Sequence, residues 1–264
     1  MHILKTKKTI KVLMLEIFFL SLIQGITEFL PISSSAHLLL ASKYLNINND
    51  NLTIDISLHL GSLLAVILFF KNEIISFISN KSLLFKILIG SVPTMIFGFL
   101  LIKFNLISYL RDINIIAITT IFFGILLYFA DKSKEKKTIE KNFSFKDSIY
   151  IGLLQIISLI PGVSRSGITI TAARFLKFDR IESAKISFLL SIPTLMAASS
   201  YTFFKIFEQK NLEITTLNFL AIILSFLISY LTLKIFVRLL KKFSLLFFVY
   251  YRILFGIFIL ISLK

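Results

Sequence analysis

The chain contains no cysteine and no tryptophan, and only 16% of its residues are charged. The lack of cysteine excludes a disulfide framework and thiol chemistry. Without tryptophan, any aromatic belt at a membrane surface depends on tyrosine and phenylalanine. A soluble domain carries about 25% charged residues. These absences argue against a soluble or disulfide-stabilised protein.

Apolar residues dominate instead, at 56% of the chain, and the mean hydropathy is +0.89. Six apolar runs cover residues 56–70, 87–102, 113–130, 186–204, 214–233 and 243–263. Each run is near or somewhat below the roughly 20 residues that a membrane-spanning helix needs. We therefore predict an all-α polytopic membrane protein with a single membrane domain, residues 1–264. The net charge of +15 is then attributed to cytoplasmic loops, and no nucleic-acid partner is expected.

Two further apolar segments break in the middle. Residues 12–30 reach Pro31, which is followed by a run of serines, and residues 148–160 reach Pro161. A helical pattern resumes at about 34–45 and 165–177. Proline ends a helix and serine caps the next one. Because each half is too short to cross a bilayer, we predict two re-entrant helical hairpins.

The two broken segments indicate an internal repeat. Gln24 precedes Pro31 much as Gln155 precedes Pro161, and three apolar runs follow each hairpin. Three spans are an odd number, so the copies should lie in opposite orientations. We predict two inverted repeats, at about 12–130 and 148–263, separated by a cytoplasmic loop at 131–147. Such repeats, with broken helices meeting at the midplane, are typical of transporters.

The distribution of basic residues gives an orientation. The loops at 71–86, 131–147, 174–185 and 234–242 hold 17 Lys and Arg residues, against 10 in the segments predicted for the other side. Basic loops mark the cytoplasmic face, so both termini should lie outside. The basic N-terminus, with four lysines before residue 12, runs against this assignment.

The second hairpin has the features of an anion site. Pro161 and Gly162 allow a sharp bend, and Ser164 can cap a helix whose free N–H groups attract phosphate. Arg165 adds a planar fork that binds phosphate in a bidentate manner. A charged residue at membrane depth is costly and is a functional candidate by default. The alternative is a polar turn between two membrane helices.

The first hairpin supplies complementary groups. Gln24 and Glu28 are four residues apart and share a helix face, while Ser34 and His37 are three apart at the start of the next half-helix. If the tips meet, Arg165 would hold a phosphate group while Ser34 or His37 attacks it, as phosphoryl transfer requires. We favour Ser34 as the nucleophile and His37 as the base that takes its proton. Glu28 would bind a metal or act as a base. Direct attack by water is a further alternative.

The polar residues are also compatible with roles other than catalysis. Glu28 can instead be a buried acid paired with arginine, and His37 can simply bond to backbone. For His59 we expect a structural or supporting role. Arg252 can pair with a carboxylate or line the pocket, and the sequence does not decide.

Three blocks of this sequence closely resemble the bacterial undecaprenyl-diphosphatase family of the bacitracin-resistance type. They run from Gln24 to His37, from Pro161 to Thr169 and from Ser187 to Pro193. The resemblance extends from about residue 14 to the C-terminus. Departures are small: Gln24 stands at a position where acidic residues also occur, and Ser35-Ala36 replaces a common Thr-Gly.

The resemblance implies hydrolysis of C55 isoprenyl diphosphate to the monophosphate and phosphate. This recycles the lipid carrier for peptidoglycan synthesis and confers bacitracin resistance. It also implies Mg²⁺ or Ca²⁺, held near Glu28 and Gln24, and a multi-pass protein of the bacterial plasma (inner) membrane with its active site open toward the periplasmic face. A transporter or flippase of a phosphorylated isoprenoid lipid is the alternative function. The oligomeric state is open, with a homodimer as one alternative.

The block around each hairpin tip also provides the expected contacts to the substrate. We expect the catalytic residues to be Glu28, Ser34, His37 and Arg165, and the substrate-binding residues to be Gln24, Ser33, Ser164, Ser166 and Thr169.

Overall fold

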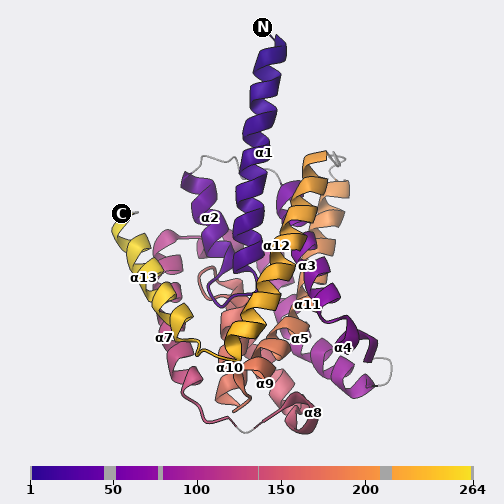
Figure 1. Cartoon of the computed structure of the whole chain (residues 1–264), viewed down its shortest axis with the longest axis vertical. Coiled ribbons are helices and arrows are strands. Elements are labelled where there is room, and N and C mark those ends of the chain that lie inside the picture. Colours follow the sequence, from indigo (N-terminus) through magenta and orange to yellow (C-terminus); the bar gives the residue numbers. More distant parts are fainter. Residues whose placement is uncertain (1, 45–51, 77–79, 136, 209–215, 263–264) are drawn as a thin grey trace.

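The computed structural model describes residues 2–44, 52–76, 80–135, 137–208 and 216–262. Within these residues the regular secondary structure is helical (Figure 1). The helices are α1 (His2–Thr27), α2 (Ser34–Tyr44), α3 (Leu52–Phe69), α4 (Lys71–Ser76), α5 (Lys81–Lys103), α6 (Ile107–Leu110), α7 (Ile113–Asp131), α8 (Ile139–Asn142), α9 (Phe145–Gln155), a 3₁₀ turn η1 (Ile156–Leu159), α10 (Arg165–Phe175), α11 (Arg180–Glu208), α12 (Thr216–Leu240) and α13 (Leu246–Ser262).

Four helices are long and apolar enough to cross a membrane: α5, α7, α12 and the Arg180–Ser200 part of α11. Shorter apolar helical stretches occur at Thr53–Phe69 and Leu246–Ser262, in α3 and α13. Each of the six predicted apolar runs therefore overlaps a helix over most of its described residues. The all-α polytopic membrane class is confirmed, whereas the repeat and loop boundaries stay predictions. Of the expected outer loops, residues 45–51 and 209–213 lie outside the described residues.

Both broken segments form hairpins. α1 and α2 run side by side toward the N-terminal end of the molecule, and α9 and α10 lie toward the opposite end (Figure 1). The rings of Phe143, before α9, and Phe178, after α10, are 5.9 Å apart, so the second hairpin begins and ends at one place. The two second halves begin at Ser34 and Arg165, as predicted.

The two tips have the same backbone feature. Ser33 and Ser164, each immediately before a helix, have positive φ angles of 74° and 70°. A side chain in this left-handed region is strained by about 1–3 kcal/mol and persists only where its surroundings hold it. Gly162, with φ of 92°, completes the second turn, and there a side chain would collide with Thr119. Both tips are thus held in conformations that the surrounding helices must enforce.

Polar caps fix the helices that lead to the tips. Ser144 and Asp147 form a reciprocal capping box at the start of α9, with Asp147 N–H 3.1 Å from Ser144 Oγ and Ser144 N–H 2.9 Å from Asp147 Oδ2. Asp112 accepts the Asn114 N–H at 2.8 Å at the start of α7. Such caps satisfy donors that a helix N-terminus leaves free.

Helices from the two halves of the chain pack against each other, with α3 against α12 and α5 against α9. An aromatic cluster fills the centre: Phe188 of α11 packs on Phe29 at 5.7 Å, on Phe70 at 5.8 Å and on Phe236 at 6.0 Å between ring centroids. Phe29 belongs to the first tip and is completely buried. This core therefore fixes the position of the first hairpin relative to α11.

Candidate functional site

The tips of the two hairpins meet in the interior, which was the condition for the site inferred from the sequence. The Gly162 N–H donates to Ser33 Oγ at 3.2 Å, and Ser166 Oγ donates to the Leu30 carbonyl at 2.8 Å. Each hairpin thus supplies a serine that bonds the backbone of the other. The residues at the two tips are held in one site although about 130 positions separate them.

Glu28 lies at the centre of this site and is 7% exposed. Its Oε1 accepts from Nη2 of Arg165 at 2.6 Å. Its Oε2 accepts from Ser34 Oγ at 2.6 Å and from Gln24 Nε2 at 3.1 Å. One buried carboxylate therefore connects three of the expected site residues. A buried charge is tolerable here because it is paired and hydrogen-bonded.

Arg165 begins α10 beside Ser164, whose hydroxyl accepts the Gly167 N–H at 3.1 Å, as a capping residue should. The Nη1 atom of Arg165 is buried and has no hydrogen-bond partner among the described residues. Buried donors are seldom left unpaired, so such an atom needs an explanation. An anion placed against Arg165 and the start of α10 would satisfy this donor.

In the structure Ser34 does not hydrogen-bond to His37, and the expected transfer of its proton to His37 stays a prediction. The Ser34 hydroxyl donates to Glu28, and the two ring nitrogens of His37 have other partners. His37 Nδ1 lies 2.7 Å from the Ser33 carbonyl oxygen, and Nε2 lies 2.6 Å from the Tyr251 hydroxyl. Because a carbonyl oxygen only accepts, Nδ1 carries the proton, and Nε2 of the neutral ring accepts from Tyr251. The neighbour that can take the Ser34 proton is Glu28.

His37 is instead built into the support of the first tip. Its ring stacks on Phe255 at 4.2 Å with an interplanar angle of 7°. Through Nδ1 it holds the carbonyl of Ser33, the residue with positive φ. Ser34 and His37 are one helical turn apart in sequence. In the structure, however, Ser34 bonds to Glu28, whereas His37 bonds to Ser33 and to Tyr251 of α13.

Gln24 and His59 form a layer behind Glu28. Gln24 Nε2 lies 3.0 Å from His59 Nδ1 and 3.4 Å from Ser62 Oγ. Ser62 in turn lies 3.0 Å from Ser229 Oγ of α12. The supporting role expected for His59 fits these contacts, since its ring bonds Gln24, which in turn bonds Glu28. Gln24 is completely buried behind the carboxylate.

The other expected substrate-binding residues are held by contacts within the protein. Ser33 and Ser166 make the bonds between the tips described above, and Ser164 Oγ also lies 3.1 Å from Ser166 Oγ. Thr169 is completely buried and donates to Ser187 Oγ at 2.7 Å, which connects two of the conspicuous sequence blocks. These hydroxyls shape the tips, and their direct contact with a substrate stays a prediction.

Arg252 is the main residue whose role the sequence left undecided. It is completely buried and donates to four backbone carbonyls: Thr120 at 3.1 Å, Pro31 at 3.2 Å, Gly162 at 2.9 Å and Val163 at 3.0 Å. It therefore fastens both tips to each other and to α7. The charge within an apolar run was the signal for Arg252; nothing in the sequence singled out its neighbour Tyr251.

A cavity of about 430 Å³ opens beside the site between α5, η1 and α11. Apolar side chains such as Met95, Phe99 and Leu195 line most of it, and Arg165 is the charged residue of the lining. A largely apolar cavity with one charged residue in its lining suits a ligand with an anionic head and an apolar tail.

The model of the family described as Bacitracin resistance protein BacA matches residues 17–258. The chain belongs to this family. A relative from Pelagibacter ubique named undecaprenyl-diphosphatase is 49% identical over 248 residues, which is 94% of this chain and 96% of that protein. A Saccharophagus degradans protein of the same name is 41% identical over 90% of this chain and 94% of its own length. Undecaprenyl-diphosphatase 1 of Pseudoalteromonas translucida is 39% identical over 94% of this chain and 98% of its own length.

A cation in this BacA family member would have few protein ligands. No group of three or more His, Cys, Asp or Glu side chains that could hold a metal occurs among the described residues. Glu28 supplies one carboxylate, and the Oε1 atom of Gln24 is buried without a hydrogen-bond partner in the described part of the chain. Mg²⁺ is commonly held by one or two carboxylates together with substrate phosphates. The unpaired amide oxygen beside Glu28 fits that arrangement.

Proposed function

We propose that this chain hydrolyses undecaprenyl diphosphate to undecaprenyl monophosphate and inorganic phosphate. The relatives named undecaprenyl-diphosphatase support the reaction. The junction of the two hairpin tips supports the location of the active site. The observation that carries the proposal is the buried contact of Ser34 and Arg165 with the same carboxylate, Glu28, together with the unpaired Nη1 of Arg165.

The substrate would lie with its diphosphate at Arg165 and the first turn of α10. Free N–H groups and the positive end of the helix dipole favour phosphate at that point. The isoprenoid chain would leave through the apolar cavity lined by Leu159 and Phe99. A cavity of about 430 Å³ has the volume of a small-molecule pocket, so only the part of a C55 chain nearest the head group fits. The remainder would lie in the bilayer.

Ser34 is the nucleophile in this proposal. Its oxygen forms a bond to the terminal phosphorus while its proton moves to Oε2 of Glu28, 2.6 Å away. The anhydride P–O bond breaks, and the isoprenyl monophosphate leaves. Water then attacks the phosphoserine, and phosphate and the free hydroxyl are formed. Arg165 stabilises the charge that develops on the phosphoryl oxygens, which is the main demand of phosphoryl transfer.

Glu28 and Gln24 would hold a divalent cation, Mg²⁺ or Ca²⁺, together with the diphosphate oxygens. When bound, the cation neutralises phosphate charge and orients the diphosphate. The Oε1 of Gln24 supports this part of the proposal because it has no partner in the described part of the chain. Arg165 competes for the same carboxylate, so the substrate would have to draw its guanidinium away in part.

The cellular role would be recycling of the lipid carrier for peptidoglycan synthesis, with bacitracin resistance as a consequence. The protein would lie in the bacterial plasma membrane, with the site open to the periplasmic face. The excess of basic residues in the loops at 71–86, 131–147, 174–185 and 234–242 supports this orientation.

Purified protein in detergent tests the reaction. Phosphate should be released from C55 diphosphate, and EDTA should stop the release until Mg²⁺ is restored. Acid quench during turnover followed by mass spectrometry should find phosphate on Ser34. Acid-labile phosphate on His37 would make the imidazole the nucleophile, and inversion at phosphorus with no trapped intermediate would indicate direct attack by water.

A transporter of phosphorylated isoprenoid lipids is the second candidate, because the two hairpins enter from opposite ends and meet in the interior (Figure 1). Proteoliposomes loaded with a non-hydrolysable C55 diphosphate analogue distinguish the two functions. Movement of the analogue between leaflets without phosphate release from the natural substrate would favour the transporter.

A further inference from the structure

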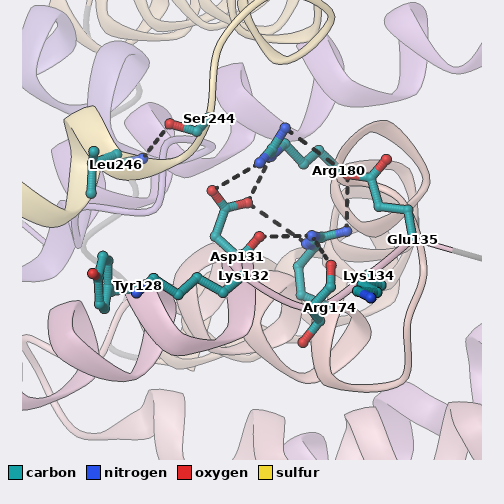
Figure 2. Close-up of a pocket in the computed structure, with 10 residues that line it drawn as sticks. Tyr128, Asp131, Lys132, Lys134, Glu135, Arg174, Arg180, Ser244 and Leu246 are labelled. Carbon is teal, nitrogen blue, oxygen red and sulfur yellow. Dashed lines mark hydrogen bonds and ion pairs between the residues drawn. The ribbon is translucent and has the colours of Figure 1, made fainter.

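A second pocket, which is polar, lies at the end of α10 opposite to Arg165. It has a volume of about 530 Å³ and is lined by residues of α7, the segment after it, α10, α11 and the turn before α13 (Figure 2). Arg174 lies nine residues after Arg165, roughly 13 Å along a helix. The pocket is therefore separate from the junction of the hairpin tips, and none of the residues discussed for the phosphatase reaction lines it.

Opposite charges in this pocket do not cancel. Its lining contains four basic residues, Lys132, Lys134, Arg174 and Arg180, and two acidic residues, Asp131 and Glu135.

Both carboxylates are already used by the arginines. Asp131 Oδ1 accepts from Arg180 Nε at 2.7 Å, and Glu135 Oε1 lies 3.3 Å from Arg174 Nη1 (Figure 2). Asp131 Oδ2 also accepts the N–H of Leu245 at 3.0 Å. The arginines and acids thus form a rigid frame, and the two lysines supply the excess positive charge.

The frame retains one unused donor. The Arg174 side chain is 1% exposed, and its Nε has no hydrogen-bond partner among the described residues, lying 3.7 Å from Asp131 Oδ1. Lys132 and Lys134 are exposed, and no ion pair joins either to another described residue. Lys132 Nζ lies over the Tyr128 ring at 4.2 Å from its centroid, which holds this ammonium at the pocket. Arg174 Nε and the two lysine ammonium groups are thus cationic donors that other described residues leave unsatisfied.

The pocket also lies where an apolar helix ends. α7 is one of the helices long and apolar enough to cross a membrane, and the pocket begins at its last turn. On the two helices that flank the pocket, Phe129 is 57% exposed and Phe247 is 72% exposed. These two residues follow Tyr128 and Leu246, which line the pocket. Exposed rings on the flanking helices and a basic pocket at the end of a membrane span fit a ligand with a phosphate head and acyl chains. Basic pockets between membrane helices bind anionic lipid head groups in this way.

We propose that this pocket binds a phosphate group, that of an anionic phospholipid, with Lys132 and Lys134 on the phosphate and the acyl chains along Phe129 and Phe247. The site would be independent of the hydrolytic reaction. An anionic lipid there would join α7, α11 and the turn before α13 at the membrane surface. Free inorganic phosphate offers the same chemistry without the chains, so the test must separate the two.

Native mass spectrometry of the full chain in detergent provides the test. Phosphatidylglycerol and phosphatidylcholine with identical chains are titrated onto the wild type and onto Lys132→Gln/Lys134→Gln. Each lysine near an anionic surface contributes about a fivefold change in affinity, so the double variant should lose about tenfold or more in phosphatidylglycerol binding. Phosphatidylcholine binding should not change. The rate of phosphate release from C55 diphosphate in detergent should also stay unchanged.

A matched control is Lys141→Gln/Lys146→Gln, which removes the same charge from two exposed lysines, in α8 and α9, that do not line the pocket. Equal losses in the two double variants, or equal binding of the two lipids to the wild type, would overturn the proposal. Binding of radiolabelled inorganic phosphate as tight as that of phosphatidylglycerol would reassign the pocket to free phosphate. Thermal unfolding of both variants within a few degrees of the wild type would exclude misfolding as the cause.

Discussion

Replacement of Arg252 by methionine should destabilise the protein and damage the site at the same time. Methionine keeps much of the length of the side chain but none of its donors. Among the described residues, Arg252 is the only hydrogen-bond donor to the carbonyl oxygens of Pro31 and Val163, whereas Gly162 O also accepts from Thr120 Oγ1 at 3.4 Å. Two buried carbonyls would lose their partner, one in each hairpin tip.

The magnitude follows from these contacts. Each buried carbonyl left without a partner costs about 1–3 kcal/mol. Together the two carbonyls would cost about 2–6 kcal/mol, and part of this loss is offset because a buried guanidinium no longer has to be desolvated. For a chain of this size we expect the midpoint of thermal unfolding to fall by about 4–20 °C. Arg252→Lys keeps the charge but cannot reach four carbonyls, so its loss should be intermediate.

Thermal unfolding in detergent, followed by size-exclusion chromatography, measures the change, and phosphate release from C55 diphosphate below the unfolding midpoint measures the site. Arg238→Met is the matched control because that arginine is exposed near the end of α12. An Arg252→Met protein that unfolded within 2 °C of the control (about the smallest shift expected for 1 kcal/mol) and retained full activity would refute the role of Arg252 in holding the two tips.

Arg165→Ala should lower kcat/KM by at least about 30- to 150-fold, and Arg165→Lys should not restore it fully, because the ammonium keeps the charge but loses the fork. Near-normal kcat/KM of Arg165→Ala would remove Arg165 from the phosphate site. Glu28→Gln should fold yet lose at least about 100-fold in turnover, since an amide cannot accept the Ser34 proton, and retention of most activity with unchanged Mg²⁺ dependence would make Glu28 structural. Tyr251→Phe should reduce kcat about fivefold, because His37 loses one hydrogen bond, and the pH dependence of kcat should not change. A new ionisation in that pH dependence would indicate that the imidazole of His37 acts as a base. Lys137→Cys should react with an impermeant reagent only after permeabilisation of cells, and labelling of intact cells would reverse the proposed orientation.

The sequence by itself determined the class of protein and the location of the two breaks. Apolar runs have to be buried in a bilayer or a core, and a proline followed by serines ends one helix and caps the next, so both signals are local. For that reason Ser34 and Arg165 could be predicted as helix starts, and Glu28 and Arg165 as site residues. The family blocks around them are equally local.

Contacts between distant residues were decided only by the tertiary structure. Spacing along a helix placed Ser34 and His37 on neighbouring positions, but the carboxylate of Glu28 lies closer to the Ser34 hydroxyl, and Tyr251, 214 positions away from His37, takes the imidazole. Arg252 could be noticed as a buried charge, yet its partners are backbone carbonyls, which every sequence contains. Hydrogen-bond partners of this kind depend on how two hairpins and α13 pack together, and no local pattern specifies that packing.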